Sequence, residues 1–250
     1  MDQGKSLKIV IEMLRAMTDS SNPDELCDFI ANDVLADFNV VASYIGVLDS
    51  DGRLTMVGSW GYPPSRRSPD DRPSLWYPMA ITDAVRTGRV HAYKTWANYI
   101  AAYPHLEHRA GPGVSFVCIP FTNKGRRAGG MGLAFGQELQ ESPELEDLWQ
   151  VLAQAGGVFV TKSWAGGVFR QNAFTAEKPM EAEDLLNSLT EREIEVLKLS
   201  AEGKTVLQIS RQLNFSESTI KQTRMAVYRK LGVKRAADLQ HAITALGLNN

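Results

Sequence analysis

Residues 190–233 read TEREIEVLKLSAEGKTVLQISRQLNFSESTIKQTRMAVYRKLGV, and this stretch decides the fold of the C-terminal part of the chain. A capping box formed by Thr190 and Glu193 opens a first helix. The apolar spacing predicts a second helix over 205–213, and Ser216 is placed to cap a third. Short helices joined by short turns in this way predict a helix-turn-helix.

The third helix has two different faces. Ile220, Val227 and Leu231 recur at helical spacing and are expected to face inward. The opposite face carries polar and long side chains in its first two turns, where a recognition helix meets base edges. These are Glu217, Ser218, Lys221, Gln222, Arg224 and Met225.

The charge of the chain is unevenly distributed. The whole chain of 250 residues has a net charge of -2, yet residues 185–250 carry ten Lys/Arg against six Asp/Glu. Between 216 and 235 there are six basic residues and one acidic one. A basic tail with this helix pattern predicts double-stranded DNA as a partner.

Residues 185–250 resemble the DNA-binding domain of the LuxR family. The similar stretches are LTERE at 189–193, VL at 196–197, EGK at 202–204, QIS at 208–210, Leu213, SESTIK at 216–221 and YRKLGV at 228–233. The resemblance implies that Lys221, Gln222 and Met225 read the major groove. It also implies that Ser218, Thr219 and Arg224 hold phosphates, together with Arg229 and Lys230 at the end of the helix.

Some of these roles have structural alternatives. The Thr219 hydroxyl would instead bond to its own helix, and Arg229 and Lys230 would instead be solvated charges at a helix end. The pair Gln222-Thr223 departs from the family pattern, and this departure concerns the preferred base sequence rather than DNA binding itself.

The last helix, expected over 236–246, carries an apolar stripe of Leu239, Ala242, Ile243 and Leu246. The family resemblance implies that such a stripe pairs two copies. The alternative is that it packs on its own helical core, and both can hold together. Because one recognition helix reads few bases, we expect a homodimer on an inverted repeat.

Residues 1–164 read as an α+β domain with a mainly antiparallel sheet flanked by helices. A linker is expected over 165–184, followed by an all-α four-helix domain over 185–250. The elements expected in the first domain are helices over 4–20 and 22–38, strands over 41–49 and 54–60, a long loop over 63–78, a helix over 80–87, a strand over 90–93, an irregular aromatic segment over 96–103, strands over 115–122 and 129–135, and a helix over 143–164.

The N-terminal domain resembles a GAF domain, a small-molecule sensing fold related to PAS. The similar stretches are YIGVLDSDGRL at 44–54, DAVRTGRV at 83–90, GVSFVCIPF at 113–121 and GGMGLAF at 129–135. Gly130, Gly132 and Ala134 share one face of their strand, which leaves space for a ligand or for close helix packing. A small apolar or amphipathic ligand would contact Tyr44, Trp60, Trp76, Trp96, Tyr99 and Gly132.

The sequence favours a ligand-modulated, DNA-binding transcription regulator, and two alternatives remain open for the sensory domain. In the first alternative the domain is an acyl-homoserine-lactone sensor, a class that it resembles in length and in its final strands. In the second alternative it serves only to bind another protein. A phosphorylated receiver domain is disfavoured because the chain opens with helices.

An enzyme is the hypothesis from a different class, and no catalytic residue, metal site or cofactor is expected. Cys27 and Cys118 are read as core thiols, and His105-x-x-His108 as a loop. The chain shows neither a signal peptide nor an apolar run long enough for a bilayer, so we expect a cytoplasmic protein with no membrane partner.

Overall fold

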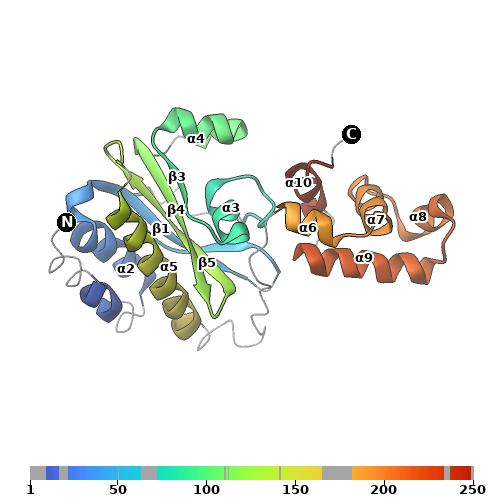
Figure 1. Ribbon diagram of the computed structural model, residues 1–250, viewed down its shortest axis with the longest axis horizontal. Helices are drawn as coiled ribbons and strands as arrows, with labels where there is room; N and C mark the ends of the chain where they lie inside the picture. Colours follow the sequence, from blue (N-terminus) through green and yellow to red (C-terminus); the bar gives the residue numbers. More distant parts are fainter. Residues whose placement is uncertain are drawn as a thin grey trace.

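The computed structural model describes residues 10–16, 22–49, 51–62, 72–109, 111, 113–140, 142–164, 182–233 and 237–248. Parts of the expected first helix (4–20), of the loop over 63–78 and of the linker over 165–184 lie outside these residues. An α+β part and a helical part lie end to end along the longest axis (Figure 1).

The N-terminal part is built on one antiparallel five-stranded sheet with the order β2-β1-β5-β4-β3. The strands are β1 (Val40–Leu48), β2 (Leu54–Trp60), β3 (His91–Tyr93), β4 (Ser115–Asn123) and β5 (Arg126–Phe135). The expectation of an α+β domain with an antiparallel sheet is therefore confirmed.

Turn residues fix the two hairpins that build this sheet. Lys124 and Gly125 between β4 and β5 both have positive φ, at 51° and 72°, as a tight hairpin with the right-handed twist of its strands requires. Gly52 between β1 and β2 has φ 77°. The segments Asp51-Gly52 and Lys124-Gly125 therefore form the turns of the two hairpins.

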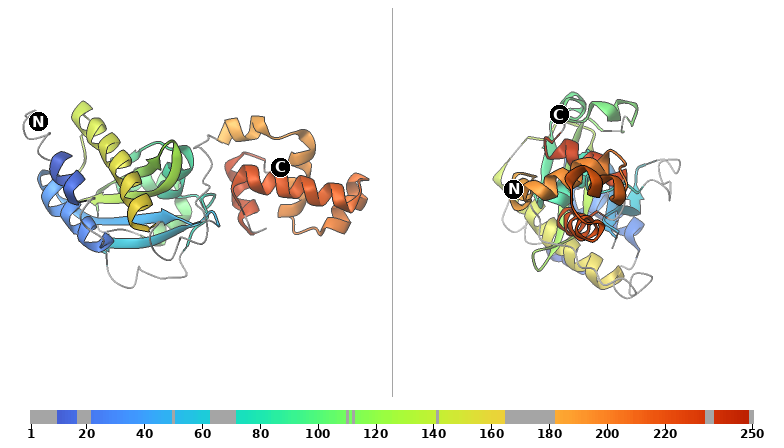
Figure 2. Two further views of the ribbon diagram at one scale, coloured as in Figure 1. Left: turned by 90° about the horizontal axis from the view of Figure 1, so that it is seen from below. Right: turned by 90° about the vertical axis from the view of Figure 1, so that its right-hand side faces the viewer.

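Helices cover both faces of the sheet, as the two turned views show (Figure 2). On one face lie α2 (Pro23–Phe29) and the long α5 (Pro143–Trp164). They bury the main core cluster, which includes Leu26, Ile119 and Phe159. On the other face lie α3 (Ala80–Thr87) and α4 (Trp96–Ala102).

Two sequence expectations in this domain need correction. The segment over 96–103, expected to be irregular, contains α4, because the Thr95 side chain caps its first turn by accepting from the Asn98 N–H. It continues into the 3-10 helix η4 (Pro104–Arg109). The helix expected over 22–38 is broken, since α2 passes into the π-helix η1 (Ile30–Val34) and the 3-10 helix η2 (Ala36–Phe38).

The C-terminal part consists of α6 (Ala182–Ser188), α7 (Glu191–Ala201), α8 (Val206–Leu213), α9 (Glu217–Leu231) and α10 (Ala237–Ala245). Thr190 and Thr205 each form a complete capping box, and Ser216 caps α9. Helix α6 begins inside the segment expected to be linker, and its Leu185 is buried in the core of this domain. Among the described residues, no helix is both long and apolar enough to span a membrane.

Candidate nucleic-acid interface

Apolar packing against α7 and α8 positions helix α9. Ile220 at its start is fully buried with Ile209 of α8 and Val196 of α7. The turn between α8 and α9 passes through Asn214, whose φ of 56° is left-handed, a conformation that Asn tolerates better than most residues. Ser216 Oγ then accepts from the Thr219 N–H at 3.1 Å, which starts α9 at a defined point.

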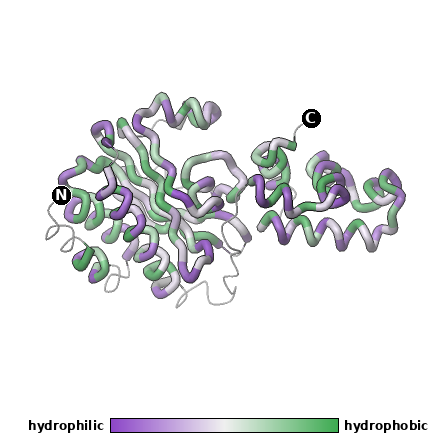
Figure 3. Tube along the Cα trace, viewed as in Figure 1, coloured by the Kyte–Doolittle hydropathy of each residue, from purple (hydrophilic) through white to green (hydrophobic). Residues whose placement is uncertain are grey.

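One side of α9 is not buried by the rest of the protein. The residues on this side are exposed, and Met225 is 73% exposed although it is a large apolar residue. They recur every three or four positions, so they form one stripe along the helix. Figure 3 shows hydrophilic and hydrophobic residues alternating along α9. The stripe consists of Ser218, Lys221, Gln222, Met225 and Arg229.

Three of the residues predicted to bind DNA are less available than this stripe. Thr219 is half-buried and its hydroxyl lies 2.8 Å from Ser216 Oγ, so it belongs to the cap of α9. Arg224 is half-buried, with its guanidinium carbon 6.0 Å from the centre of the Tyr228 ring. Lys230 bonds to groups of its own domain, and its role as a phosphate contact stays a prediction.

The Lys230 ammonium donates to Glu193 Oε2 at 2.7 Å and to the Ser188 carbonyl at 2.8 Å. The same Glu193 oxygen accepts from the Thr190 N–H at 2.8 Å. Burial of the Glu193 carboxyl disfavours its charged form, but the bonds from Lys230 and Thr190 outweigh that cost and hold its pKa below the ordinary value. This cluster ties α9 to the start of α7.

The stripe predicted to pair two copies is buried within the chain. Leu239 and Ala242 are 0% exposed, and Ile243 and Leu246 are 6% exposed. They pack with Leu185, Leu197 and Leu231 in the core of the helical domain. In this structure all four residues therefore pack on the core of their own domain, which is the alternative stated above.

Of the six residues predicted to line a ligand pocket, Trp60 and Trp76 lie apart from the other four. Tyr44, Trp96 and Tyr99 lie on the face covered by α3 and α4, whereas Trp60 packs on the opposite face with the main core cluster. Trp76 is buried in the core of the helical domain. The space above Gly132 is filled, because a Cβ there would lie 2.2 Å from Tyr44 Cε1.

Tyrosines and one acid form a hydrogen-bonded group on the α3/α4 face, which the sequence analysis did not single out. The Tyr93 hydroxyl donates to the Tyr103 hydroxyl at 3.0 Å, and Tyr103 donates to Asp83 Oδ2 at 2.8 Å. Burial, and then the Asp83 carboxylate, raise the pKa of the Tyr103 phenol. These hydroxyls therefore stay protonated and act as hydrogen-bond donors at neutral pH.

Two further features bear on the chemistry of the N-terminal domain. A cavity of about 40 Å³ lies between β3 and the start of α5, lined by Ala92, Lys94, Ser142 and Trp149 among others, and it has room for only a few water molecules. Burial raises the pKa of the Cys118 thiol to about 12, so it is protonated at neutral pH and poorly suited as a nucleophile.

Comparison with known proteins agrees with this geometry. The GAF domain family model matches residues 20–161, which is more than half of the chain. The chain belongs to the GAF domain family. Residues 187–243 match the model of bacterial regulatory proteins of the luxR family, so a LuxR-family helix-turn-helix domain follows the GAF domain.

Individual proteins show the same division. Over 86 residues the chain is 31% identical to the response regulator UvrY of Escherichia coli K12 and to that of Shigella flexneri, a match that covers 34% of this chain and 39% of each relative. The chain thus spans well under half of the length of these regulators.

Solved structures show the GAF fold. The GAF domain of a phosphoenolpyruvate-protein phosphotransferase from Acinetobacter aligns with a TM-score of 0.53 at 15% identity, covering 67% of this chain and 98% of that one. The corresponding domain from Coxiella burnetii aligns with a TM-score of 0.52 at 16% identity, covering 67% and 100%.

Sequence reasoning missed the residues that form the contact between the GAF domain and the helix-turn-helix domain. Arg53 pairs with Asp238, and the rings of Tyr77 and His241 meet edge to face at 5.3 Å. Residues so far apart in the sequence leave no local pattern. One signal was available, namely an apolar Trp76 next to a loop rich in Pro, Arg, Ser and Asp.

Proposed function

We propose that this GAF-domain chain is a DNA-binding transcription regulator that reads duplex DNA with helix α9. The observation that supports this best is the exposed stripe of Lys221, Gln222 and Met225 on a capped helix whose other side is locked into the domain core. Lys221 and Gln222 can donate hydrogen bonds to base edges in the major groove, and Met225, one turn further on, can make an apolar contact there.

The remaining exposed polar residues of the stripe suit the DNA backbone. Arg229 is exposed near the end of α9, and Ser218 is exposed in its first turn. Contacts to phosphates position a protein on DNA without reading its sequence. Arg224 takes the same role if its side chain leaves the Tyr228 ring.

Substitutions in the stripe test the proposal by separating specific from general binding. In the full chain, Lys221→Ala or Gln222→Ala should weaken a preferred duplex by about 1–3 kcal/mol relative to random duplex. Arg229→Ala should weaken both duplexes alike and lower the salt dependence by about one charge. Fluorescence anisotropy titrations at several salt concentrations measure these quantities.

The matched control is Arg15→Ala, because Arg15 is exposed on the helix at residues 10–16, remote in sequence from the stripe. Its DNA affinity should equal that of the unaltered chain. Equal losses for Arg15→Ala and Lys221→Ala would contradict the assignment of α9 as the reading element.

We further propose that two copies act together through α10 on an inverted repeat, and that the GAF domain modulates this binding. The tyrosine group of Tyr93, Tyr103 and Asp83 supports a small apolar or amphipathic effector with a polar end. Native mass spectrometry of the purified chain beside Tyr99→Ala tests this, since a bound species lost in the variant is the expected result.

A second role for the GAF domain is favoured by a specific observation. Tyr44 fills the face above Gly132, and Trp76 packs into the helix-turn-helix core. In this second role the GAF domain acts by binding to protein surfaces and not by binding a small molecule. If native mass spectrometry finds no bound species, docking alone accounts for the domain.

A further inference from the structure

The GAF domain meets the helix-turn-helix domain at the C-terminal end of α9. The approach is backbone against backbone at one point, because a Cβ on Gly52 would lie 2.3 Å from the Gly232 carbonyl oxygen. Gly52 lies in the hairpin between β1 and β2, and Gly232 is the C-cap of α9. The helix proposed to read DNA therefore ends directly against the GAF domain.

Helix α9 is held at two places along its length. At its start, Ile220 packs in a cluster made of residues from α7, α8 and α9. Near its end, Val227 and Leu231 belong to the larger core of the helical domain. A helix of 15 residues is about 22 Å long and behaves as a stiff rod, so both clusters set the position of the exposed stripe.

Trp76 is the residue that the GAF domain contributes to the second of these clusters. It is 3% exposed, and the other buried members of the cluster in the described part of the chain all lie between Leu185 and Leu246. A buried Trp contributes a large apolar area to a core. The core around the end of α9 is therefore completed by a residue from the other domain.

The indole of Trp76 also caps α9. Carbonyls in the last turn of a helix have no partner within the helix and need one from elsewhere. The Tyr228 carbonyl accepts from the Val233 N–H at 2.9 Å. The Leu231 carbonyl accepts instead from Trp76 Nε1 at 2.7 Å. A hydrogen bond from the GAF domain thus fixes the last residue of α9.

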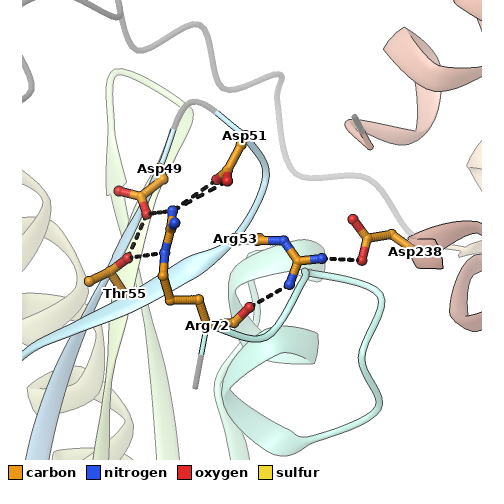
Figure 4. Close-up of polar contacts among 6 residues, drawn as sticks. All are labelled: Asp49, Asp51, Arg53, Thr55, Arg72 and Asp238. Atoms are coloured by element: carbon orange, nitrogen blue, oxygen red, sulfur yellow. Dashed lines mark hydrogen bonds and ion pairs between the residues drawn. The ribbon is translucent and has the colours of Figure 1, made fainter. Parts of the chain in front are cut away.

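A charged pair holds the β1–β2 hairpin against the helical domain. Arg53 Nη2 lies 2.6 Å from Asp238 Oδ1, with side chains 17% and 6% exposed (Figure 4). Arg53 is oriented by a second bond from its Nη1 to the Arg72 carbonyl at 2.7 Å. Because both charges are largely buried, removing one leaves the other without compensation. The pair therefore stabilises the arrangement in which Trp76 reaches α9.

Arg86 on α3 connects Trp76 to the tyrosine group. Its guanidinium carbon lies 5.1 Å from the centre of the Trp76 ring, and its Nη2 donates to Asp83 Oδ1 at 2.7 Å. The other oxygen of Asp83 accepts from the Tyr103 hydroxyl at 2.8 Å. The indole ring that caps α9 is thus held from behind by the interior of the GAF domain.

We propose that Trp76 is a positioning residue for DNA reading, which fixes the end of α9 so that Lys221 and Gln222 meet base edges in the right place. The docked arrangement of the two domains is then the one that reads DNA specifically. It leaves the stripe from Ser218 to Arg229 exposed. The inference rests on the proposed function, since it assigns a further residue to the same DNA-reading site.

Positioning has a different consequence from stability. Hydrogen bonds to base edges need accurate placement of a side chain, whereas contacts to phosphates carry no sequence information. A loosened end of α9 should therefore lower the affinity for a preferred duplex and leave the affinity for random duplex unchanged. A purely structural role of Trp76 would lower both affinities alike, because less of the chain would be folded.

Trp76→Phe tests this in the full chain, since it keeps an aromatic ring in the core and removes the N–H donor. The ratio of preferred-duplex to random-duplex affinity, measured by fluorescence anisotropy, should fall about 2- to 10-fold, which corresponds to one hydrogen bond. Amide hydrogen exchange over residues 228–233 should become faster. Trp149→Phe is the matched control, because Trp149 is 6% exposed in the main core of the GAF domain, and it should leave the ratio unchanged.

Two further variants separate positioning from stability. If Trp76 acts through the reading face, Trp76→Phe should lower the ratio less in a Lys221→Ala chain than in the unaltered chain. Arg53→Met, which removes the charged pair and keeps Trp76, should lower the ratio in the same direction as Trp76→Phe.

Two results would overturn the positioning role. One is an unchanged ratio in both Trp76→Phe and Arg53→Met, and the other is effects of Trp76→Phe and Lys221→Ala that simply add. The proposed function fails in a distinguishable way, because the unaltered chain would then show no preference for any duplex that Lys221→Ala could remove.

Discussion

At Gly132, adding a single methyl group tests whether the space above this residue is open to a ligand or filled by the Tyr44 ring. A Cβ there would lie 2.2 Å from Tyr44 Cε1, so Gly132→Ala must displace the Tyr44 ring. We expect it to lower the free energy of unfolding by about 1–3 kcal/mol, as overpacking of a core does. Urea unfolding measures this loss.

Gly46→Ala on the neighbouring strand is the matched control, because its Cβ would meet Leu54 at an ordinary distance of 3.8 Å. Combining Gly132→Ala with Tyr44→Val should recover part of the lost stability. A Gly132→Ala chain as stable as Gly46→Ala would show that the face is open, and would revive the pocket read from the sequence.

Residue-level prediction succeeded where the cause is local. Thr190 and Ser216 cap their helices through bonds to residues three positions on, and such spacing is visible in the sequence. Lys230 could not be read in this way. Its partner Glu193 is 37 residues away, and only the packing of α9 on α7 brings the two together.

At the scale of elements, the capping box of α7 and its bond to Lys230 predict a pH-dependent stability. The pKa of Glu193 is lowered in the folded chain. Its contribution is therefore fully present above its unfolded pKa of about 4.3, and is lost as the pH falls through the lower folded value. Glu193→Gln should destabilise the helix-turn-helix domain by about 1–2 kcal/mol at pH 7.

The difference between the unaltered chain and Glu193→Gln should shrink as the pH falls below 4, in urea unfolding followed by circular dichroism. Glu195→Gln is the control, because Glu195 lies on the same helix and is exposed. An equal loss for the two variants at pH 7, or a Glu193→Gln loss independent of pH, would contradict this account of the cluster.

Most elements were predictable because their patterns repeat over several residues. The bounds of α3 (Ala80–Thr87) and β2 (Leu54–Trp60) agree with the expectation, since Gly88 ends the first and alternation marks the second. Helix α4 was missed because seven residues with three aromatic or β-branched side chains show no clear apolar face. The Thr95 cap three residues before Asn98 was the signal that could have found it.

At the scale of the whole molecule, the sequence predicted two domains but not their contact. Strand alternation, helix caps and the basic C-terminal stretch each depend on neighbouring residues. The contact of Arg53 with Asp238 joins residues 185 positions apart, and that of Trp76 with Leu231 joins residues 155 apart. Such pairs depend on how two finished domains meet.

The packing around this contact also accounts for two residues that lie elsewhere than predicted. Trp76 was assigned to a ligand site and Ala242 to an interface between copies, yet both lie in one cluster of buried residues. Trp76 was predicted to contact a ligand, and in this structure it is buried in the core of the helical domain. Its partner is the other domain of the same chain.

The central claim is that this chain reads duplex DNA through α9 as a pair of LuxR-type domains. Selection of the full chain against a pool of random-sequence duplexes tests it most directly. The account predicts enrichment of an inverted repeat with half-site centres about one helical turn apart, bound more weakly as salt rises, and lost on Lys221→Ala. Absence of any enriched sequence, together with binding that does not depend on salt, would contradict it.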